Sequence, residues 1–354
     1  MNAIDSNRSI LVTTDFLSER IATVNYHSQG IIPLLVSIFN RFSHCVDEFP
    51  RNFFTPNKYF DPQIFFNLSG FDYSKELPPI VDINDVSPES IRYFENKFKS
   101  YDIVVGWELM PLTEKIFDLI GIRYINMWLH PVRFMDDEIL AVKTNCNKFL
   151  KFLKKYSISE DSFYVNAAYC KAVIKRRSKI KIDKNSAAIF GQVSNDKTLR
   201  TQNGFLSLSK NYLDEILRIS ASYNKIYFCK HPLQKNDSEF KFLKSQVKNI
   251  ENISANGYEI IANENIDLVA AISSSITIES YYFGKDVVVF NKPTVDINGE
   301  EYCNIGVEFF DPKFWANCFG YKGYEQNGVF RFGEKNKFRN VLDAYYSYGI
   351  MKDF

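Results

Sequence analysis

Ala271-Ile-Ser-Ser-Ser-Ile-Thr-Ile-Glu-Ser-Tyr-Tyr-Phe-Gly-Lys-Asp-Val-Val-Val-Phe290 is the stretch of this chain that decides the fold. The short, mostly apolar run from Ile266 to Ile272 predicts a buried strand, which stops at three serines. A helix-compatible segment follows and ends at Gly284, and the run from Val287 to Phe290 predicts a second buried strand. Together these segments predict an α/β unit, and the start of its helix can hold a phosphate on unpaired backbone N–H groups.

The size and charge of the chain limit what it can be. Its 354 residues suffice for two domains of ordinary size, and the hydrophobic share of 45% allows a substantial core. The formal net charge of +1 provides no long-range field that would gather a nucleic-acid backbone. We therefore expect no nucleic-acid partner.

The cysteines and the first residues of the chain bear on its compartment. The six cysteines form no CxxC pair, and no histidine stands at metal-ligand spacing from one of them. This usage is typical of a reduced cytoplasmic protein and argues against a zinc site. The segment MNAIDSNRSILVTTDF lacks the charged start and apolar core of a secretory signal, and no apolar run approaches the ~20 residues that span a bilayer. We expect a cytoplasmic protein, at most peripheral on the inner face of the cytoplasmic membrane.

Strands and helices alternate in both halves of the chain, which predicts α/β domains with mainly parallel sheets. In the first half, strands are expected at 9–13, 101–106 and 123–128, and helices at 30–42, 87–100 and 111–119. In the second half, strands are expected at 186–192, 225–230 and 253–254, and helices at 204–222, around 243 and at 258–263. The tail from 336 to 348 has a helical, aromatic pattern.

A segment with a different pattern, residues 137–184, joins these halves. Helical spacing dominates it, and lysines cluster at 148–156 and 171–184. The pattern predicts a helical connection between two domains. A solvated helix face is the favoured reading of the lysines, and a basic rim that meets an anionic lipid surface or a glycolipid is the alternative.

Glu108 is the first candidate for chemistry. It follows the predicted strand Tyr101–Val105 in the motif Gly106-Trp107-Glu108. A glutamate at the carboxyl end of a strand points into the cleft of such a domain and could accept a proton from a hydroxyl group. An acidic residue in a surface loop is an equally good reading of this motif alone.

Trp128-Leu-His-Pro-Val-Arg-Phe-Met-Asp-Asp137 follows the next strand and carries two further candidates, His130 and Arg133. Arginine suits bidentate recognition of a carboxylate. The pair Asp136-Asp137 resembles a metal-binding acidic motif, but an acidic turn at a helix N-terminus is the better reading.

Phe190-Gly-Gln-Val-Ser-Asn-Asp-Lys-Thr198 follows the first strand of the second half and places Gln192 and Asp196 in a polar loop. Taken alone, Asp196 reads more easily as an Asx turn or a helix cap than as a functional acid.

Phe228-Cys-Lys-His-Pro-Leu233 ends another predicted strand, because its proline stops the ladder of hydrogen bonds. Lys230 and His231 can offset phosphate charge at this position.

The serine turn is the last candidate. Ser273, Ser274 and Ser275 can offer hydroxyl and N–H donors to a phosphate, and Glu279, one helical turn later, can bind ribose hydroxyls. The alternative is a helix cap formed by one serine, with Glu279 satisfying the first turn. Taken alone, this turn supports the phosphate site and the helix cap equally.

The order of these motifs resembles the retaining β-Kdo glycosyltransferases of bacterial capsule and lipopolysaccharide assembly. Gly-Trp-Glu, His-Pro-x-Arg-Phe, Gly-Gln-x-x-x-Asp, Lys-His-Pro and Ser-Ser with a downstream Glu follow one another between about residues 100 and 320. The Lys-His-Pro and Ser-Ser motifs are shared with sialyl- and polyol-phosphate transferases. The segments with Gln192 and with Arg133 narrow the resemblance to the β-Kdo transferases.

The pattern of elements and the resemblance imply the GT-B fold, in which two Rossmann-like domains face each other across a cleft and the last helix crosses back. We expect an N-terminal, acceptor-side domain with the helical connection at 1–184. A nucleotide-sugar-binding domain is expected at 185–335, and a C-terminal helix packing back on the first domain at 336–354.

The resemblance further implies a donor, CMP-β-Kdo, and transfer with retention through a sugar adduct on Asp196. Glu108 is then the acid/base near the acceptor, and His231 with Lys230 stabilises the departing CMP phosphate. The remaining residues bind the donor. Arg133 meets the Kdo carboxylate, and the CMP and sugar contacts fall to His130, Gln192, Ser273, Ser274, Ser275 and Glu279. A donor with one phosphate needs no metal clamp, so we expect no metal and no cofactor.

The expected partners are therefore a CMP-sugar donor and a glycan or glycolipid acceptor, with peripheral contact to the inner membrane or to other glycan-assembly enzymes. Three other functions stay open on the sequence. One is an enzyme of the same fold with another donor, a CMP-sialic-acid-like sugar or CDP-glycerol. The others are a nucleotide-sugar 2-epimerase and, with less support, a non-catalytic glycan- or nucleotide-binding module.

Overall fold

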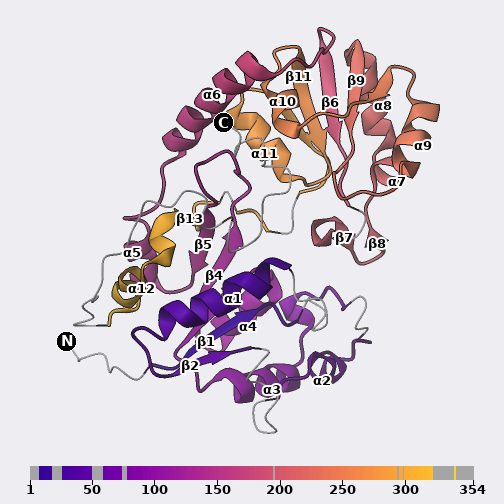
Figure 1. The fold of residues 1–354 in the computed structure, drawn as a ribbon. Helices are drawn as coiled ribbons and strands as arrows, with labels where there is room; N and C mark the ends of the chain where they lie inside the picture. The colour runs from indigo at the N-terminus through magenta and orange to yellow at the C-terminus, as the bar shows by residue number, and fades with distance from the viewer. Residues whose placement is uncertain are drawn as a thin grey trace. The chain divides into compact units, whose positions relative to one another are not determined.

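The chain forms two compact units in a computed structural model (Figure 1). The structure describes residues 8–17, 26–49, 59–73, 78–193, 196–292, 295–297, 299–321 and 339, without the side chains of 26–29 and 197. The first unit is drawn from Met1–His130, Asp137–Ile158 and Ile297–Ala344. The second is drawn from Pro131–Asp136, Ser159–Asp296 and Tyr345–Phe354.

The first unit is built on a six-stranded sheet with the order β13-β5-β4-β3-β1-β2. The strands β1 to β4 run parallel to one another. β5 pairs antiparallel with β4, and β13 pairs antiparallel with β5. The strands are β1 (Ile10–Thr14), β2 (Val46–Glu48), β3 (Ile103–Trp107), β4 (Arg123–Leu129), β5 (Leu140–Thr144) and β13 (Cys303–Ile305).

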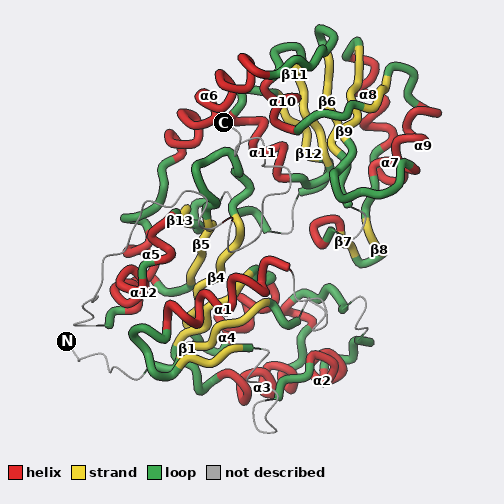
Figure 2. Tube along the Cα trace, in the orientation of Figure 1, coloured by secondary structure: helices red, strands yellow, loops and turns green. Residues whose placement is uncertain are grey.

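Helices cover both faces of this sheet (Figure 2), so its central strands carry apolar residues without alternation. In β3, Ile103 and Val105 belong to one core cluster and Val104 to another. Ser87 caps the N-terminus of α3 by accepting a hydrogen bond from the Ser90 N–H. The helices are α1 (Tyr26–Phe39), α2 (Pro62–Leu68), α3 (Pro88–Phe98), α4 (Pro111–Leu119), α5 (Asn147–Leu153) and α12 (Pro312–Phe319).

The second unit holds a five-stranded, fully parallel sheet with the order β10-β9-β6-β11-β12. Its strands are β6 (Ser186–Phe190), β9 (Lys225–Cys229), β10 (Ile250–Asn252), β11 (Ile266–Ala271) and β12 (Asp286–Val289). A short antiparallel ribbon of β7 (Arg200–Thr201) and β8 (Gly204–Phe205) follows β6. The helices are α6 (Glu160–Arg177), α7 (Leu208–Asn211), α8 (Leu213–Ser222), α9 (Ser238–Gln246), α10 (Gly257–Ala262) and α11 (Ser275–Tyr282).

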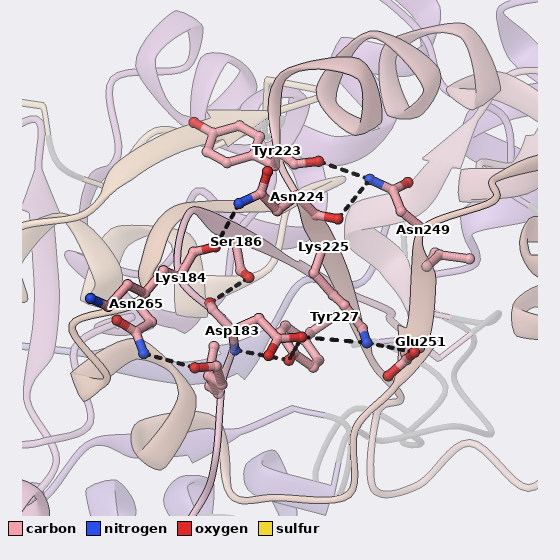
Figure 3. A network of polar contacts seen from close by, with 12 residues as sticks. Asp183, Lys184, Ser186, Tyr223, Asn224, Lys225, Tyr227, Asn249, Glu251 and Asn265 are labelled. Atoms are coloured by element: carbon pink, nitrogen blue, oxygen red, sulfur yellow. Dashed lines mark hydrogen bonds and ion pairs between the residues drawn. The ribbon is translucent and has the colours of Figure 1, made fainter.

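Polar side chains tie together the amino ends of the strands in the second sheet (Figure 3). Asn249 donates to the Tyr223 carbonyl at 2.8 Å, and Asn265 donates to the Ile182 carbonyl at 2.7 Å. Lys225 forms ion pairs with Asp183 and Glu251. This network lies at the end of the sheet opposite the carboxyl ends of the strands, which are left for ligands.

The strand order of each sheet reverses once, and the reversal marks where such sheets bind ligands. In the first sheet the reversal lies between β1 and β3. The chain adds β2 outward from β1, and it adds β4, β5 and β13 outward from β3. In the second sheet the reversal lies between β6 and β11. The α/β class and the pair of Rossmann-like units are confirmed, in agreement with the predicted GT-B fold. The predicted C-terminal helix lies outside the described residues, apart from Arg339.

The unit boundaries differ from the predicted domain boundaries. α6 belongs to the second unit, because Phe163, Ala167, Cys170 and Ile174 are buried on its inner face. The segment Ile297–Ala344 returns to the first unit, because β13 pairs with β5 and α12 joins the same core. Length and periodicity alone could not show these long-range contacts.

Two predicted elements also need correction. The helix expected at 204–222 begins later, since Gly204 has a φ of 115° and Ser207 caps α7. The segment expected to be a helical connection contains the strand β5, whose residues pair with β4.

Candidate functional site

Gln192 bridges the two strands on either side of the reversal in the second sheet. It follows β6, and its Oε1 accepts a hydrogen bond from the Ser273 N–H, after β11, at 2.9 Å. Its Nε2 donates toward the Asp196 Oδ2 at 3.3 Å and toward the Ser273 Oγ at 3.4 Å. The side chain is only 9% exposed, so these bonds are sheltered from water. Gln192 therefore connects the loop with Asp196 to the serine turn.

Asp196 is held by side-chain contacts on both oxygens. Its Oδ1 accepts hydrogen bonds from the Thr198 N–H and Oγ1, each at 2.9 Å. The Thr198 Oγ1 in turn accepts from the Ser273 Oγ at 2.9 Å. The turn-forming role that the sequence suggested for Asp196 is present, and it coexists with membership of the network Gln192–Asp196–Thr198–Ser273. Thr198 is a member of this network that sequence reasoning missed.

His231 and Lys230 follow β9 and line a small pocket together with Gln192. The His231 Nδ1 accepts a hydrogen bond from the Leu233 N–H at 3.1 Å, which assigns the proton of the neutral ring to Nε2. Burial lowers the pKa of His231, and the negative charge of Asp196 partly offsets this. His231 is thus placed as a neutral Nε2–H donor.

Lys230 carries its charge beside an acid. Its Nζ lies 2.7 Å from the Asp237 Oδ1, and this pairing lowers the pKa of Asp237. Asp237 lines the same pocket as His231. The positive charge of Lys230 is therefore shared between this carboxylate and any anion that enters the pocket.

The serine turn leads into α11 without a side-chain cap. Ser274 is the N-cap residue, and its hydroxyl makes no capping hydrogen bond. The Thr277 N–H and Oγ1 donate to the Ser274 carbonyl, at 3.1 and 2.7 Å. The alternative in which a serine caps the helix and Glu279 satisfies its first turn is therefore wrong. The start of α11, with Ser274 and Ser275, keeps the dipole and N–H donors that attract an anion.

Glu279 is buried, with 2% of its surface exposed. The Tyr258 hydroxyl, on α10, donates to its Oε1, and the Arg133 N–H donates to the same atom at 2.7 Å. The structure thus brings Glu279 and Arg133 together through the backbone of Arg133. Phe134 packs beside Phe283, with ring centroids 5.5 Å apart, and fixes this segment on the second unit.

Glu108 belongs to the first unit and follows β3 at the reversal of that sheet. Its φ of 53° is a left-handed conformation that glutamate rarely adopts, and the residue is 8% exposed. Asn126, on β4, holds the next residue: its Oδ1 accepts from the Leu109 N–H at 2.9 Å, and its Nδ2 donates to the Leu109 carbonyl at 2.8 Å. Strained backbone that is held in this way is concentrated at functional sites.

Asp15 is a second buried acid at this reversal, and sequence reasoning missed it. It follows β1 and is 1% exposed. Its Oδ1 accepts from the Met110 N–H at 3.1 Å and from the Thr113 hydroxyl, so it fixes the loop between β3 and α4. An acid directly after a buried apolar strand was the available signal.

His130 and Arg133 belong to different units, although they are only three positions apart in the sequence. His130 ends the first-unit segment, is 1% exposed, and donates its N–H to the Ile139 carbonyl at 2.8 Å. Arg133 lies with the second unit. The helix N-terminus expected at Asp136-Asp137 is wrong, because bends lead from there into β5 and the Asp137 Oδ1 accepts from the Glu138 and Arg339 N–H groups.

Two properties of the described part of the chain bear on metals and membranes. It contains no group of three or more His, Cys, Asp or Glu side chains that could hold a metal ion. None of its helices has the length and apolar character of a membrane span. Metal independence itself stays a prediction.

Comparisons with known proteins give structural neighbours only. No family model and no curated protein matches the chain. A β-Kdo 2,7-transferase, KpsC of Thermosulfurimonas dismutans, is 13% identical with a TM-score of 0.39, over 81% of this chain and 80% of that one. A UDP-GlcNAc 2-epimerase of Neisseria meningitidis is 11% identical with a TM-score of 0.29, over 81% and 84% of the two chains. A glycosyltransferase of Rickettsia africae is 10% identical with a TM-score of 0.28, over 98% and 96%. At these values the likeness carries no inference about what this chain does.

Proposed function

We propose that this chain is a glycosyltransferase that moves Kdo from CMP-β-Kdo to a bacterial surface glycan or glycolipid, with retention at the anomeric carbon. One observation carries the proposal: the Asp196 carboxylate shares a hydrogen-bond network with the serine turn at the reversal of the second sheet. A nucleophile and a phosphate-binding helix start are then parts of one site. The order of the sequence motifs supports the choice of donor.

The CMP phosphate is assigned to the start of α11. Ser274 and Ser275 supply N–H and hydroxyl donors there, where the helix dipole favours an anion. The His231 Nε2–H is a further donor, since its Nδ1 is occupied by the Leu233 N–H. Lys230, from the same pocket, offsets the charge that develops on the departing phosphate.

The first chemical step is attack by Asp196 on the anomeric carbon of Kdo. The bond from that carbon to the phosphate oxygen breaks, CMP leaves with the electron pair, and an ester of Asp196 forms with inversion. The Oδ2 is the better nucleophile, because the Oδ1 already accepts two hydrogen bonds from Thr198, whereas among the described residues the Oδ2 accepts only the longer contact from Gln192.

The second step is attack by an acceptor hydroxyl on the same carbon. The ester bond breaks, Asp196 leaves as a carboxylate, and the second inversion gives net retention. Glu108 is assigned as the base that accepts the proton of the acceptor hydroxyl, because its strained backbone and its place at the end of β3 suit a positioned base. Arg133 is assigned to the Kdo carboxylate, and His130 and Glu279 to donor contacts.

Intact-protein mass spectrometry tests the proposal directly. The full chain is exposed to CMP-β-Kdo that is generated in the reaction mixture, without an acceptor and with a metal chelator. We expect a mass increase of one Kdo residue, located on Asp196 by peptide mapping. The Asp196→Asn variant should show no adduct and should still bind CMP.

Asp267→Asn is the matched control, because Asp267 is an exposed aspartate near the start of β11, at the opposite end of the same sheet. It should form the adduct as the wild type does. An adduct that persists in Asp196→Asn, or turnover without any adduct, would remove the covalent role. A preference for UDP or CDP over CMP in equilibrium binding would overturn the choice of donor.

A further inference from the structure

α6 carries apolar side chains on two opposite faces. Its inner face, with Phe163, Ala167, Cys170 and Ile174, is buried in the second unit, where the helix lies along α10 and α11 (Figure 1). The opposite face should be polar if only water met it. Instead, Val165 is 69% exposed and Tyr169 is 68% exposed, and the exposed alanines 168 and 172 lie between and after them.

A neighbouring helix extends this outer apolar face. Tyr164 on α6 is 42% exposed, and Tyr281 on α11 is 56% exposed. Their ring centroids are 6.4 Å apart. Aromatic side chains of two adjacent helices therefore stand together at the surface of the second unit, as a ridge that also contains Val165 and Tyr169.

Positive charge gathers at one end of this ridge. No acidic residue occurs between Asp161 and Asp183, although the chain as a whole has a net charge of only +1. Lysine and arginine in this interval are Lys171, Lys175, Arg176, Arg177, Lys179 and Lys181.

Some of these cations are engaged within the unit. Lys171 donates to the Phe283 carbonyl at 3.1 Å, and Lys175 pairs with Glu264. Arg176 continues the exposed face of α6 beyond Tyr169, and Lys179 and Lys181 are exposed just after the helix ends. The surface thus combines tyrosines and valine with adjacent outward cations.

We propose that the outer face of α6 docks on an anionic lipid bilayer. Tyrosine has an apolar ring and a polar tip and is suited to the headgroup level, and lysine and arginine reach anionic headgroups from the same depth. The charge of the surface complements that of an anionic leaflet. A nucleic acid could contact the cations, but its binding would not explain why valine and alanine side chains are exposed on the same face. This docking is independent of the proposed transfer reaction.

Sedimentation of the full chain with vesicles tests the proposal. We expect binding to vesicles of phosphatidylcholine mixed with phosphatidylglycerol, weak binding to phosphatidylcholine alone, and release by salt. Arg176→Glu changes the charge by two units, and at about fivefold per unit it should weaken binding about 25-fold. Val165→Ser and Tyr169→Ser should each weaken binding several-fold and leave CMP binding unchanged.

Matched controls separate this face from general surface effects. Lys248→Glu reverses an exposed charge elsewhere on the second unit, and Leu119→Ser removes a side chain that is 64% exposed on the first unit. Both should bind vesicles as the wild type does. Equal weakening by the controls, or no vesicle binding by the wild type, overturns the proposal. So does a vesicle-free dimer that Tyr169→Ser dissociates, because it assigns the face to a second copy, or RNA binding that replaces lipid binding.

Discussion

Glu108 and Asp196 are held in their places by different means. Asp196 is oriented through its side chain, by Thr198 and Gln192. Glu108 is oriented through its backbone, whose left-handed conformation costs roughly 1–2 kcal/mol for a residue with a Cβ. Stability that is given up at a single position in this way is expected where the direction of the side chain matters for function.

Replacing Glu108 tests this strain. Glu108→Gly should be more stable than Glu108→Ala by about 1 kcal/mol, because only glycine adopts a positive φ without cost. Urea unfolding of the two variants measures the difference, and both should lack transfer activity.

Asn185 provides the matched control, since its φ is 55° and asparagine tolerates this region. Asn185→Gly should stay close to the wild type in stability, whereas Asn185→Ala should be less stable than Asn185→Gly by the same ~1 kcal/mol as at Glu108. Equal stability of the two Glu108 variants would show that the loop relaxes and stores no strain.

At the scale of elements, a side chain on one strand holds the loop after its neighbour. Asn126 lies on β4 and is fully buried, and it bonds both the N–H and the carbonyl of Leu109. Its Nδ2 also donates to the Glu114 Oε1 on α4 at 2.7 Å. The loop between β3 and α4 is therefore fastened to the sheet from inside the protein.

Asn126→Ala should destabilise the first unit by about 2–4 kcal/mol, because two buried backbone groups would lose their partners. Asn145→Ala is the comparison: Asn145 also accepts from one backbone N–H and donates to one carbonyl, but it is exposed, so water replaces it. We expect a loss of about 1 kcal/mol or less there. Chemical denaturation measures both, and similar losses would contradict the role of burial.

At the scale of the molecule, buried thiols make stability depend on alkaline pH. Burial raises the pKa of Cys170 to about 12, and it also raises the pKa values of Cys229 and Cys318 above the ordinary 9.0. Above pH 9 the unfolded chain releases these protons while the folded chain keeps them, so stability falls as the pH rises. Lys285 acts in the opposite sense from pH 8, since burial lowers its pKa to about 8, but it is a single group.

We therefore expect the free energy of unfolding to fall above pH 9, with a slope of about 1.4 kcal/mol per pH unit for each thiol in the unfolding unit. Urea unfolding at a series of pH values, under reducing conditions, measures this slope. Cys170→Ala should reduce the slope for the second unit, to which Cys170 belongs. A slope that is unchanged in Cys170→Ala would refute the assignment.

Patterns of neighbouring residues were enough to predict much of the fold and of the candidate site. The runs that became β6, β9 and β11 were recognisable because strands buried on both faces are mostly apolar, although Asp267 interrupts β11. Gln192, Asp196 and Ser273 were singled out because each follows such a strand. By contrast, Asp15 acts on Met110 across 95 positions and Asn126 acts on Leu109 across 17, so no motif contained either pair.

The amino-acid sequence alone determined that this is an α/β chain, and it determined the places where strands end in polar turns. These properties depend on periodicity and on turn chemistry between near neighbours, which the printed sequence contains. Only the tertiary structure decided that α6 and Pro131–Asp136 join the second unit, that 297–321 returns to the first, and that Asp196 meets Ser273 through Gln192 and Thr198. Those outcomes depend on burial and hydrogen bonds between residues far apart in the chain, where local spacing gives no information.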